Sequence, residues 1–358
     1  MTVTPAASAL PSAAEPLFIL AMDHRDSFAR TVFGVPGTPT AGQLTRMREA
    51  KSLIFAAARR VVAPSAGRLG VLVDEHLGAD VAREARAAGF VLAMPAEVSG
   101  ADRLTFEYGD DFARHVEEFD PDWVKVLVRF NPADPADLRA AQTETLRRLN
   151  DWVAGAGRNW LIELLVPPTR EQLAAHDDQA LYDAHQRPAL TAEVITTLTA
   201  AGIRPGIWKL EGYETTPGAE LVLAAVRDSA HPASCIVLGR NAAQRQVDHW
   251  LRVAAPLPGY VGFAVGRSIW EDPITDYEAG RGDAEGTQAR IARRYSHFIQ
   301  RYLAADPALA GESAARLTPA LEAEIRAASA AADAAGGQLP AWMTQSVLAE
   351  LDSVRSGR

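Results

Sequence analysis

The sequence of 358 residues lacks several features that would point to particular protein classes. Its one cysteine, Cys235, excludes an internal disulfide and a zinc site built on cysteines. None of its apolar runs approaches the ~20 residues that a membrane-spanning helix needs. Its first 16 residues contain neither the cationic segment nor the apolar segment of a signal peptide. With a net charge of −9 and no basic stripe, it is not expected to bind nucleic acid or an anionic membrane. These absences predict a soluble, cytoplasmic protein.

Lysine is nearly absent as well. Only three of the 36 basic residues are lysine (Lys51, Lys125 and Lys209), and the others are arginine. Arginine stays protonated and cannot form a Schiff base, whereas a buried lysine can lose its proton and attack a carbonyl carbon. The chemistry of each lysine is therefore considered separately. Lys51 falls in an amphipathic segment, Gln43–Val62, and is expected to be a solvated surface charge.

The sequence does contain short apolar runs that alternate with longer amphipathic segments. Continuous apolar runs are typical of strands buried on both faces, so eight of them separated by helices predict an α/β fold, a (β/α)8 barrel. No glycine-rich dinucleotide fingerprint follows any run, which disfavours the alternative of an open doubly wound sheet. The predicted strands are Leu17–Met22, Leu69–Val73, Phe90–Met94, Trp123–Phe130, Trp160–Val166, Gly206–Leu210, Cys235–Leu238 and Val261–Val265.

The chain divides into three expected parts. Residues 1–16 contain much alanine and proline and are expected to form a flexible leader. Residues 17–305 are expected to form the barrel. Residues 306–358 are rich in alanine and predict a C-terminal helical extension. Because this extension would pack on the barrel or on a partner subunit, a homo-oligomer is one expected assembly.

Charged residues interrupt three of the apolar runs. Lys125, Glu163 and Lys209 lie between apolar neighbours, where a charge is costly unless it is paired or neutralised. Strand alternation adds Arg129 to the face of Lys125 and Glu211 to the face of Lys209. If these faces point into the barrel, burial and a neighbouring ammonium lower the pKa of a lysine and make its amine a nucleophile. The structural alternative is that these residues serve only as ion-pair partners.

Asp23, His24 and Arg25 come directly after the first predicted strand. Three polar side chains at that point favour a site, since barrel enzymes place functional groups at the carboxyl ends of strands. A helix cap followed by a turn is the structural alternative. A metal site has weaker support, because only the run Asp74-Glu75-His76, together with His24, is a candidate to bind a divalent ion. We therefore expect neither a metal nor a cofactor.

Two Gly-Arg pairs follow the last two predicted strands. They are Gly239-Arg240 and Gly266-Arg267. Barrels commonly bind phosphate at this place with backbone N–H groups and the N-terminus of a helix. An arginine adds a bidentate contact to such an anion. The two pairs therefore predict a phosphate-binding site.

Six stretches of the sequence resemble, in order and at similar spacing, the class I aldolase barrel family. They are LFILAMDHRDSF, WVKVLVRFNP, WLIELLVPP, IWKLEGYE, IVLGRNA and VGFAVGRSIWEDP. The resemblance is greatest to the 2-deoxy-5-keto-D-gluconate 6-phosphate aldolase domain of inositol catabolism, which is often fused to 5-dehydro-2-deoxygluconokinase. Tagatose-1,6-bisphosphate aldolases are more distant relatives and have a glutamine where this sequence has His24.

The resemblance implies a (β/α)8 lyase that uses a Schiff base and needs no metal. In this sequence Lys209 matches the Schiff-base lysine and Lys125 the second lysine of the family. Glu163 matches the family's glutamate, and Asp23 its aspartate after the first strand. The family's phosphate-binding strand ends match the two Gly-Arg pairs. The expected partner is a small phosphorylated sugar.

The sequence thus predicts an aldolase that cleaves 2-deoxy-5-keto-D-gluconate 6-phosphate to dihydroxyacetone phosphate and malonate semialdehyde. Glu163, with Asp23 as its rival, is expected to move the proton, and His24, Arg25 or Arg129 to meet the substrate carboxylate. The alternatives are an aldolase for another ketose phosphate, of the tagatose bisphosphate or sulfo-sugar phosphate type, a metal-dependent lyase, and a non-catalytic sugar-phosphate-binding protein.

Overall fold

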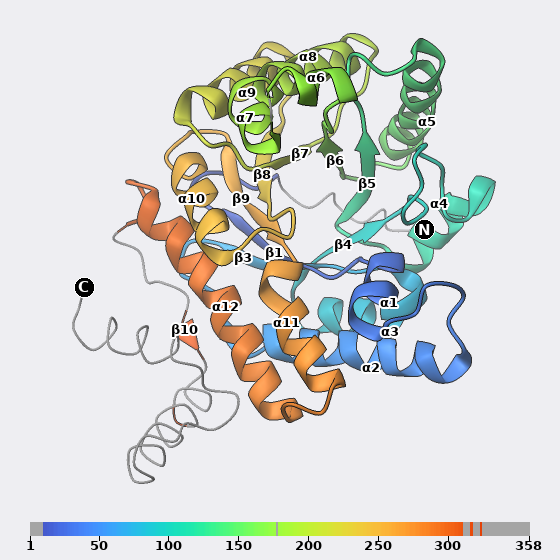
Figure 1. Cartoon of the computed structure of the whole chain (residues 1–358), viewed down its shortest axis with the longest axis vertical. Helices are drawn as coiled ribbons and strands as arrows, with labels where there is room; N and C mark the ends of the chain where they lie inside the picture. The colour runs from blue at the N-terminus through green and yellow to red at the C-terminus, as the bar shows by residue number, and fades with distance from the viewer. Residues whose placement is uncertain (1–9, 177, 311–315, 318–322, 324–358) are drawn as a thin grey trace.

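Eight parallel strands form a closed barrel at the centre of the computed structural model (Figure 1). The structure describes residues 10–176, 178–310, 316–317 and 323. The predicted barrel is confirmed, and each predicted strand is present with ends that differ by at most one residue. In barrel order the strands are β1 (Leu17–Ala21), β3 (Arg68–Leu72), β4 (Val91–Pro95), β5 (Trp123–Arg129), β6 (Trp160–Leu165), β7 (Ile207–Glu211), β8 (Ser234–Leu238) and β9 (Tyr260–Val265).

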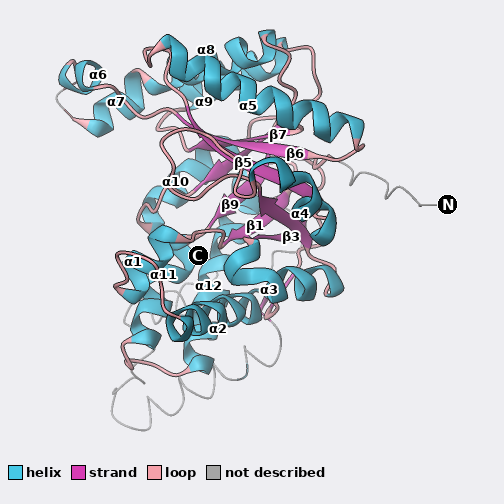
Figure 2. Cartoon of the chain, turned by 90° about the vertical axis from the view of Figure 1, so that its right-hand side faces the viewer, coloured by secondary structure: helices cyan, strands magenta, loops and turns pink. Residues whose placement is uncertain are grey.

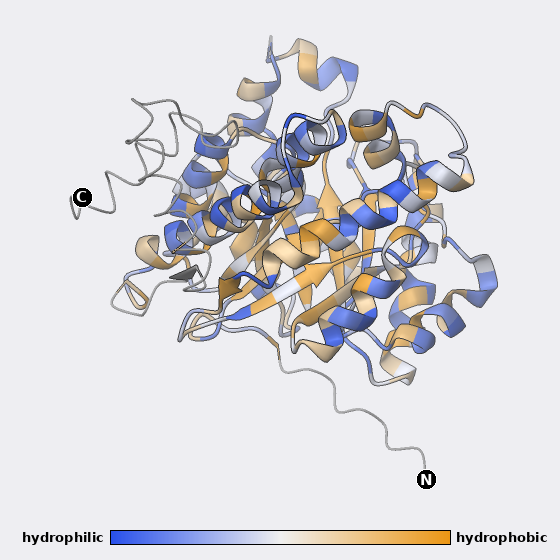
Figure 3. Cartoon of the chain, turned by 90° about the horizontal axis from the view of Figure 1, so that it is seen from below, coloured by the Kyte–Doolittle hydropathy of each residue, from blue (hydrophilic) through white to orange (hydrophobic). Residues whose placement is uncertain are grey.

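Helices surround the barrel on its outside (Figure 2). Their apolar faces pack on the strands, as in α10, where Val247, Trp250, Leu251 and Ala254 are buried at helical spacing. Figure 3 shows the hydrophobic strands inside and the helices with mixed hydropathy around them. The helices are α1 (Asp26–Phe33), α2 (Ala41–Ala58), α3 (Glu75–Ala87), η1 (Gly109–Asp111), α4 (Phe112–Phe119), α5 (Ala136–Gly155), α6 (Arg170–Ala174), α7 (Gln179–His185), α8 (Arg187–Ala200), α9 (Thr216–Asp228), α10 (Gln244–Ala254), α11 (Arg267–Glu278) and α12 (Ala284–Ala305).

The interior of the barrel changes from apolar to charged along the strands. Its lower part is a cluster of buried apolar side chains that includes Trp123, Leu161 and Ile207. Side chains two residues apart on a strand share a face, so the next interior position on each of these strands is Lys125, Glu163 and Lys209, respectively. The apolar cluster therefore forms a closed floor, and the charged residues lie above it.

The chain just before β1 lies at the floor of the barrel. Ser234 Oγ, at the start of β8, donates a hydrogen bond to the carbonyl oxygen of Pro11 at 3.3 Å. The side chain of Leu10 lies against Gly206, directly before β7, where an added Cβ would come within 2.9 Å of it. Residues 10–16, the described part of the predicted leader, thus pack at the amino ends of the strands.

The predicted C-terminal helical extension, residues 306–358, falls almost entirely outside the described residues. Within it, β10 (Arg316–Leu317) pairs antiparallel with β2 (Val61–Val62), which follows α2. Among the described residues, no helix has the length and apolar character needed to cross a membrane.

The prediction for Lys51 is wrong. Its residue is only 1% exposed, and its ammonium forms an ion pair with Asp74 and lies 5.6 Å from the ring centroid of Phe28. The reason is its place on α2, because it falls on the stripe that also buries Met47 and Ile54. Lys51 is therefore a buried structural charge.

Candidate active site

A cavity of about 300 Å³ lies at the carboxyl ends of the barrel strands. The structure brings together on its wall all but one of the site residues predicted from the sequence. The exception is Glu211, which is buried behind the wall. The predicted residues on the wall are Asp23, His24, Arg25, Lys125, Arg129, Glu163, Lys209, Gly239, Arg240, Gly266 and Arg267.

Lys209 and Glu163 form a buried polar pair on the wall of the cavity. They are register partners on β7 and β6, and neighbouring register partners in a sheet project from the same face. Lys209 Nζ lies 2.9 Å from Glu163 Oε2, and both residues are at least nine-tenths buried. A carboxylate oxygen is therefore held within proton-transfer distance of a buried amine.

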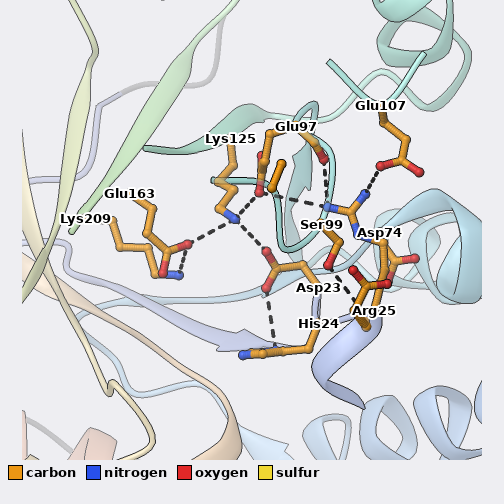
Figure 4. Close-up of polar contacts among 12 residues, drawn as sticks. Asp23, His24, Arg25, Asp74, Glu97, Ser99, Glu107, Lys125, Glu163 and Lys209 are labelled. Carbon is orange, nitrogen blue, oxygen red and sulfur yellow. Dashed lines mark hydrogen bonds and ion pairs between the residues drawn. The ribbon is translucent and has the colours of Figure 1, made fainter. Parts of the chain in front are cut away.

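Lys125 lies at the centre of three carboxyl groups (Figure 4). Its Nζ donates to Asp23 Oδ2 at 2.8 Å and to Glu97 Oε1 at 2.5 Å, and Glu163 Oε2 lies 3.1 Å away. Lys125 is 2% exposed, so water does not weaken these interactions. The Oε2 atom of Glu163 thus lies between the two lysines of the cavity.

The charges around Lys125 set the protonation of its neighbours. Burial alone raises the pKa of Asp23, but Lys125 and Lys209 outweigh it and hold that pKa well below its ordinary value. Against the same effect of burial, Lys209 and Lys125 lower the pKa of Glu163. Burial lowers the pKa of Lys125, but Asp23, Glu97 and Glu163 reverse this and raise it. Asp23 and Glu163 are therefore carboxylates, and Lys125 is an ammonium.

His24 borders the same cavity as a neutral imidazole. Burial lowers its pKa to about 4, although the charge of Asp23 acts in the opposite direction. The ring contacts Trp270 edge to face, with centroids 5.4 Å apart. His24 Nδ1 lies 3.9 Å from Asp23 Oδ1, which is too long for a hydrogen bond. A neutral imidazole provides one hydrogen-bond donor and one acceptor to the cavity.

Arg25 is the anchor of a hairpin rather than a free cation. Backbone hydrogen bonds join residues 96–107 after β4 into this hairpin, and its tip borders the cavity. Arg25 donates to Glu107 Oε2 and to the carbonyl oxygen of Glu97, each at 2.8 Å. Arg129 holds the tip through the carbonyl oxygen of Ala101 at 3.3 Å. Both arginines therefore position the hairpin.

The turn after β8 presents Arg240 to the cavity. Arg240 and Asn241 both have left-handed backbone conformations (φ 47° and 59°), which non-glycine residues adopt at a cost. Arg240 Nη1 lies 2.7 Å from Asp183 Oδ2 and 3.1 Å from Glu211 Oε1. Glu211 thus forms an ion pair with Arg240 and does not line the cavity. Asp183, the second partner of Arg240, lies on α7.

The turn after β9 leads directly into α11. Gly266 is its N-cap residue, and Arg267 begins the helix. An added Cβ at Gly266 would come within 2.2 Å of the carbonyl oxygen of Ala21 and 3.1 Å of the His24 ring. Only glycine therefore lets β1 and α11 approach this closely. The N-terminus of α11 and the turn at Arg240 border one side of the cavity together.

Four charged residues on the cavity wall were not predicted from the sequence. They are Asp26, Arg30, Glu97 and Arg103. Glu97 follows the end of β4 by two residues, so the rule that located the other strand-end residues also applies to it. Arg30 lies on α1 and Arg103 near the hairpin tip, and no pattern in the sequence marks either one.

The structure does not bring the metal candidates together. Asp74 binds Lys51 and also caps α3 by accepting a hydrogen bond from Leu77 N at 2.8 Å. His24 and His76 line different cavities. Within the described part of the chain, no group of three or more His, Cys, Asp or Glu side chains has the arrangement of a metal site.

Comparisons with known proteins identify a family. A family model described as "Uncharacterized protein conserved in bacteria (DUF2090)" matches residues 5–305. No curated protein matches the sequence.

Several solved structures are similar at low sequence identity. One is a structural-genomics target from Corynebacterium glutamicum, with 17% identity, a TM-score of 0.49, and coverage of 82% of this chain and 89% of that chain. Two are archaeal fructose-1,6-bisphosphate aldolases, each covering 80% of this chain and 94% of its own, with identities of 12% and 13% and TM-scores of 0.48 and 0.45. The first of these two aldolases has its catalytic lysine covalently bound to the carbinolamine intermediate of its substrate.

Proposed function

Since the chain belongs to the DUF2090 family, whose printed description names no activity, we propose its function from its own site: it is a class I aldolase that forms a Schiff base through Lys209. The observation that carries this proposal is the buried pair of Lys209 Nζ and Glu163 Oε2, 2.9 Å apart. The pair lies in a cavity that also holds cationic groups suited to an anionic substrate.

The choice of Lys209 over Lys125 rests on their partners. Lys125 lies among three carboxyl groups, and the charges of Asp23 and Glu163 raise its pKa, so it stays protonated and cannot attack a carbonyl carbon. Lys209 has Glu163 as its ionic partner within the described residues. Lys125 therefore orients the carboxyl groups, and Lys209 supplies the nucleophile.

The proposed reaction is a retro-aldol cleavage. Lys209 gives a proton to Glu163 and adds to the substrate ketone to form a carbinolamine. Glu163 returns this proton to the hydroxyl group of the carbinolamine, which leaves as water, so that Glu163 is again a carboxylate. The iminium that remains accepts the electrons of the breaking C–C bond. A carboxylate takes the proton from the hydroxyl group whose carbon becomes the aldehyde, and a proton returned to the enamine carbon completes the step. Glu163 is favoured over Asp23 for this transfer, because Glu163 lies beside Lys209 and Asp23 is bonded to Lys125.

We propose 2-deoxy-5-keto-D-gluconate 6-phosphate as the substrate. Its phosphate would lie against Arg240, Arg267 and the N-terminus of α11, where anions are stabilised. Its carboxylate would meet cations elsewhere on the wall. Because Arg25 is bonded to Glu107 and to Glu97, Arg129 and the unforeseen Arg30 and Arg103 are the better candidates.

The proposal is tested by trapping the Schiff base. Wild-type protein is incubated with dihydroxyacetone phosphate and sodium borohydride, and the peptides are analysed by mass spectrometry. We expect the reduced adduct on the peptide that contains Lys209. Lys209→Arg should give no adduct and should lower kcat by several orders of magnitude, since it removes the nucleophile.

Lys125→Arg is the matched control, because arginine keeps the positive charge among the same carboxyl groups. It should still form the adduct at Lys209, although cleavage slows. An adduct on Lys125 in the wild type would reverse the two roles. Binding of the sugar phosphate without any adduct or cleavage would instead support a non-catalytic binding protein.

A further inference from the structure

Glu97 differs from the other two carboxyl groups around Lys125. Its Oε1 accepts the hydrogen bond from Lys125, and its Oε2 is buried with no hydrogen-bond partner among the described residues. A buried acceptor without a partner is costly, and such an atom in a native structure calls for an explanation. Glu97 is 6% exposed and lies on the cavity wall, so a bound substrate can reach it.

The charges of Lys125, Lys209 and the three carboxyl groups around Lys125 sum to zero when Glu97 is neutral. Asp23 and Glu163 then provide two carboxylates for the two lysines. Arg25, whose Nη2 lies 4.0 Å from Glu97 Oε1, has its own partner in Glu107. A third carboxylate would place excess negative charge in a buried site, which is unfavourable.

The surroundings of Glu97 support the same protonation state. Burial raises the pKa of Glu97 above its ordinary value, and the charge of Asp23 adds to this effect. Lys125 and Arg25 oppose it but do not reverse it. These three residues are the charged groups with the largest effects on the pKa of Glu97. Glu107 and Glu163 lie beyond them, as partners of Arg25 and Lys125. Asp23 and Glu163 have their pKa values lowered instead, so Glu97 is the one carboxyl of the three that favours its acid form.

From this geometry we propose that Glu97 binds substrate as a neutral carboxylic acid, in which Oε2 donates a hydrogen bond to a substrate hydroxyl oxygen while Oε1 keeps its bond to Lys125. The inference rests on the proposed aldolase function and extends it to the substrate class. A site with an acid donor next to an ammonium selects a polyhydroxylated ketose, because a substrate without that hydroxyl leaves the donor unpaired.

The experiment compares Glu97→Gln with Glu97→Ala, using 2-deoxy-5-keto-D-gluconate 6-phosphate as substrate. Glutamine has the same shape, keeps an oxygen for Lys125 and always carries N–H donors. We therefore expect the KM of Glu97→Gln to be at least about threefold lower than the KM of Glu97→Ala. Glu97→Ala should raise KM by about tenfold, the effect of losing one hydrogen bond of about 1.4 kcal/mol.

The pH profile gives a readout that a structural role does not change. In the wild type, KM should rise with increasing pH as Glu97 loses its proton, and in Glu97→Gln this rise should be absent. A 100-fold loss of kcat in Glu97→Gln, restored in Glu97→Asp, would overturn the proposal, because it would mean that a negative charge is needed. An unchanged rise of KM with pH in Glu97→Gln would overturn it as well.

Two further measurements separate this inference from its premise. Borohydride trapping at Lys209 tests the aldolase function alone, and it should succeed in both Glu97 variants. No adduct in the wild type would overturn the proposed function and this inference together, whereas normal trapping with a failed Glu97 test overturns only the inference. Glu107→Gln is the matched control for folding, since Glu107 also bonds Arg25 but does not line the cavity.

Discussion

At the scale of single residues, a buried charge outside the cavity also needs a partner of opposite charge. Lys51 and Asp74 are each 1% exposed and form a pair between α2 and the start of α3. Removing one partner of such a pair leaves the other charge buried and uncompensated. The pair therefore links α2 to the start of α3, and separating the two helices would leave two buried charges without partners.

Lys51→Met should lower the free energy of unfolding by about 3–5 kcal/mol. Urea denaturation measures this loss. Arg48→Met on the exposed side of the same helix is the control and should change stability by no more than about 0.5 kcal/mol. Adding Asp74→Asn to Lys51→Met should recover part of the loss, because asparagine still caps α3 and carries no charge. Equal effects of Lys51→Met and Arg48→Met would contradict the structural role.

At the scale of elements, the strands were predictable and the loops were not. A strand buried on both faces needs a continuous apolar run, and this requirement alone located β5, β6 and β7 with their charged interior positions. Asp183, on α7, accepts a hydrogen bond from Arg240, which lies 57 positions later in the sequence, after β8. No local pattern encodes such a pairing, so the sequence identified Arg240 but not what holds it.

Two glycines give an element-scale prediction with opposite signs. Gly266→Ala should destabilise the protein by about 1–3 kcal/mol, since its Cβ would overlap the carbonyl oxygen of Ala21 and push α11 away from β1. Gly42→Ala, in α2, meets no atom within 4 Å and should stabilise it by at most about 1 kcal/mol. Urea midpoints check both. A neutral Gly266→Ala would mean that the two elements are free to separate.

At the scale of the whole molecule, burial of His24 makes the fold sensitive to acid. The pKa of His24 is lowered by burial from 6.5 to about 4, so between these values the unfolded chain binds a proton that the folded chain does not. Stability therefore falls as the pH drops through this window, by up to about 1.4 kcal/mol per pH unit. The carboxylates of Asp23 and Glu163, whose pKa values are lowered, begin to lose their stabilisation only below their ordinary values of 3.8 and 4.5.

His24→Gln should flatten this dependence between pH 6.5 and 4.5. The measurement is the free energy of unfolding in urea at several pH values in that range. His231, whose pKa burial also lowers, is present in both proteins and contributes equally to both. Parallel slopes for the wild type and His24→Gln would show that His24 is protonated in the fold.

The overall architecture followed from the sequence because the number and spacing of apolar runs leave few ways to close a parallel sheet. Part of the site could also be predicted from the sequence, because a charged residue in an apolar strand of a barrel is most stable in a polar interior site. The balance among Asp23, Glu97 and Glu163 did not follow, because it depends on distances between strands that a linear pattern does not contain.

The position of Leu10 and Pro11 at the amino ends of the barrel strands has a practical consequence. Leu10 and Pro11 lie at the pole opposite the cavity. If the chain has the proposed activity, a bead or an electrode attached to side chains at this pole should leave the cavity open to the medium and the activity unchanged.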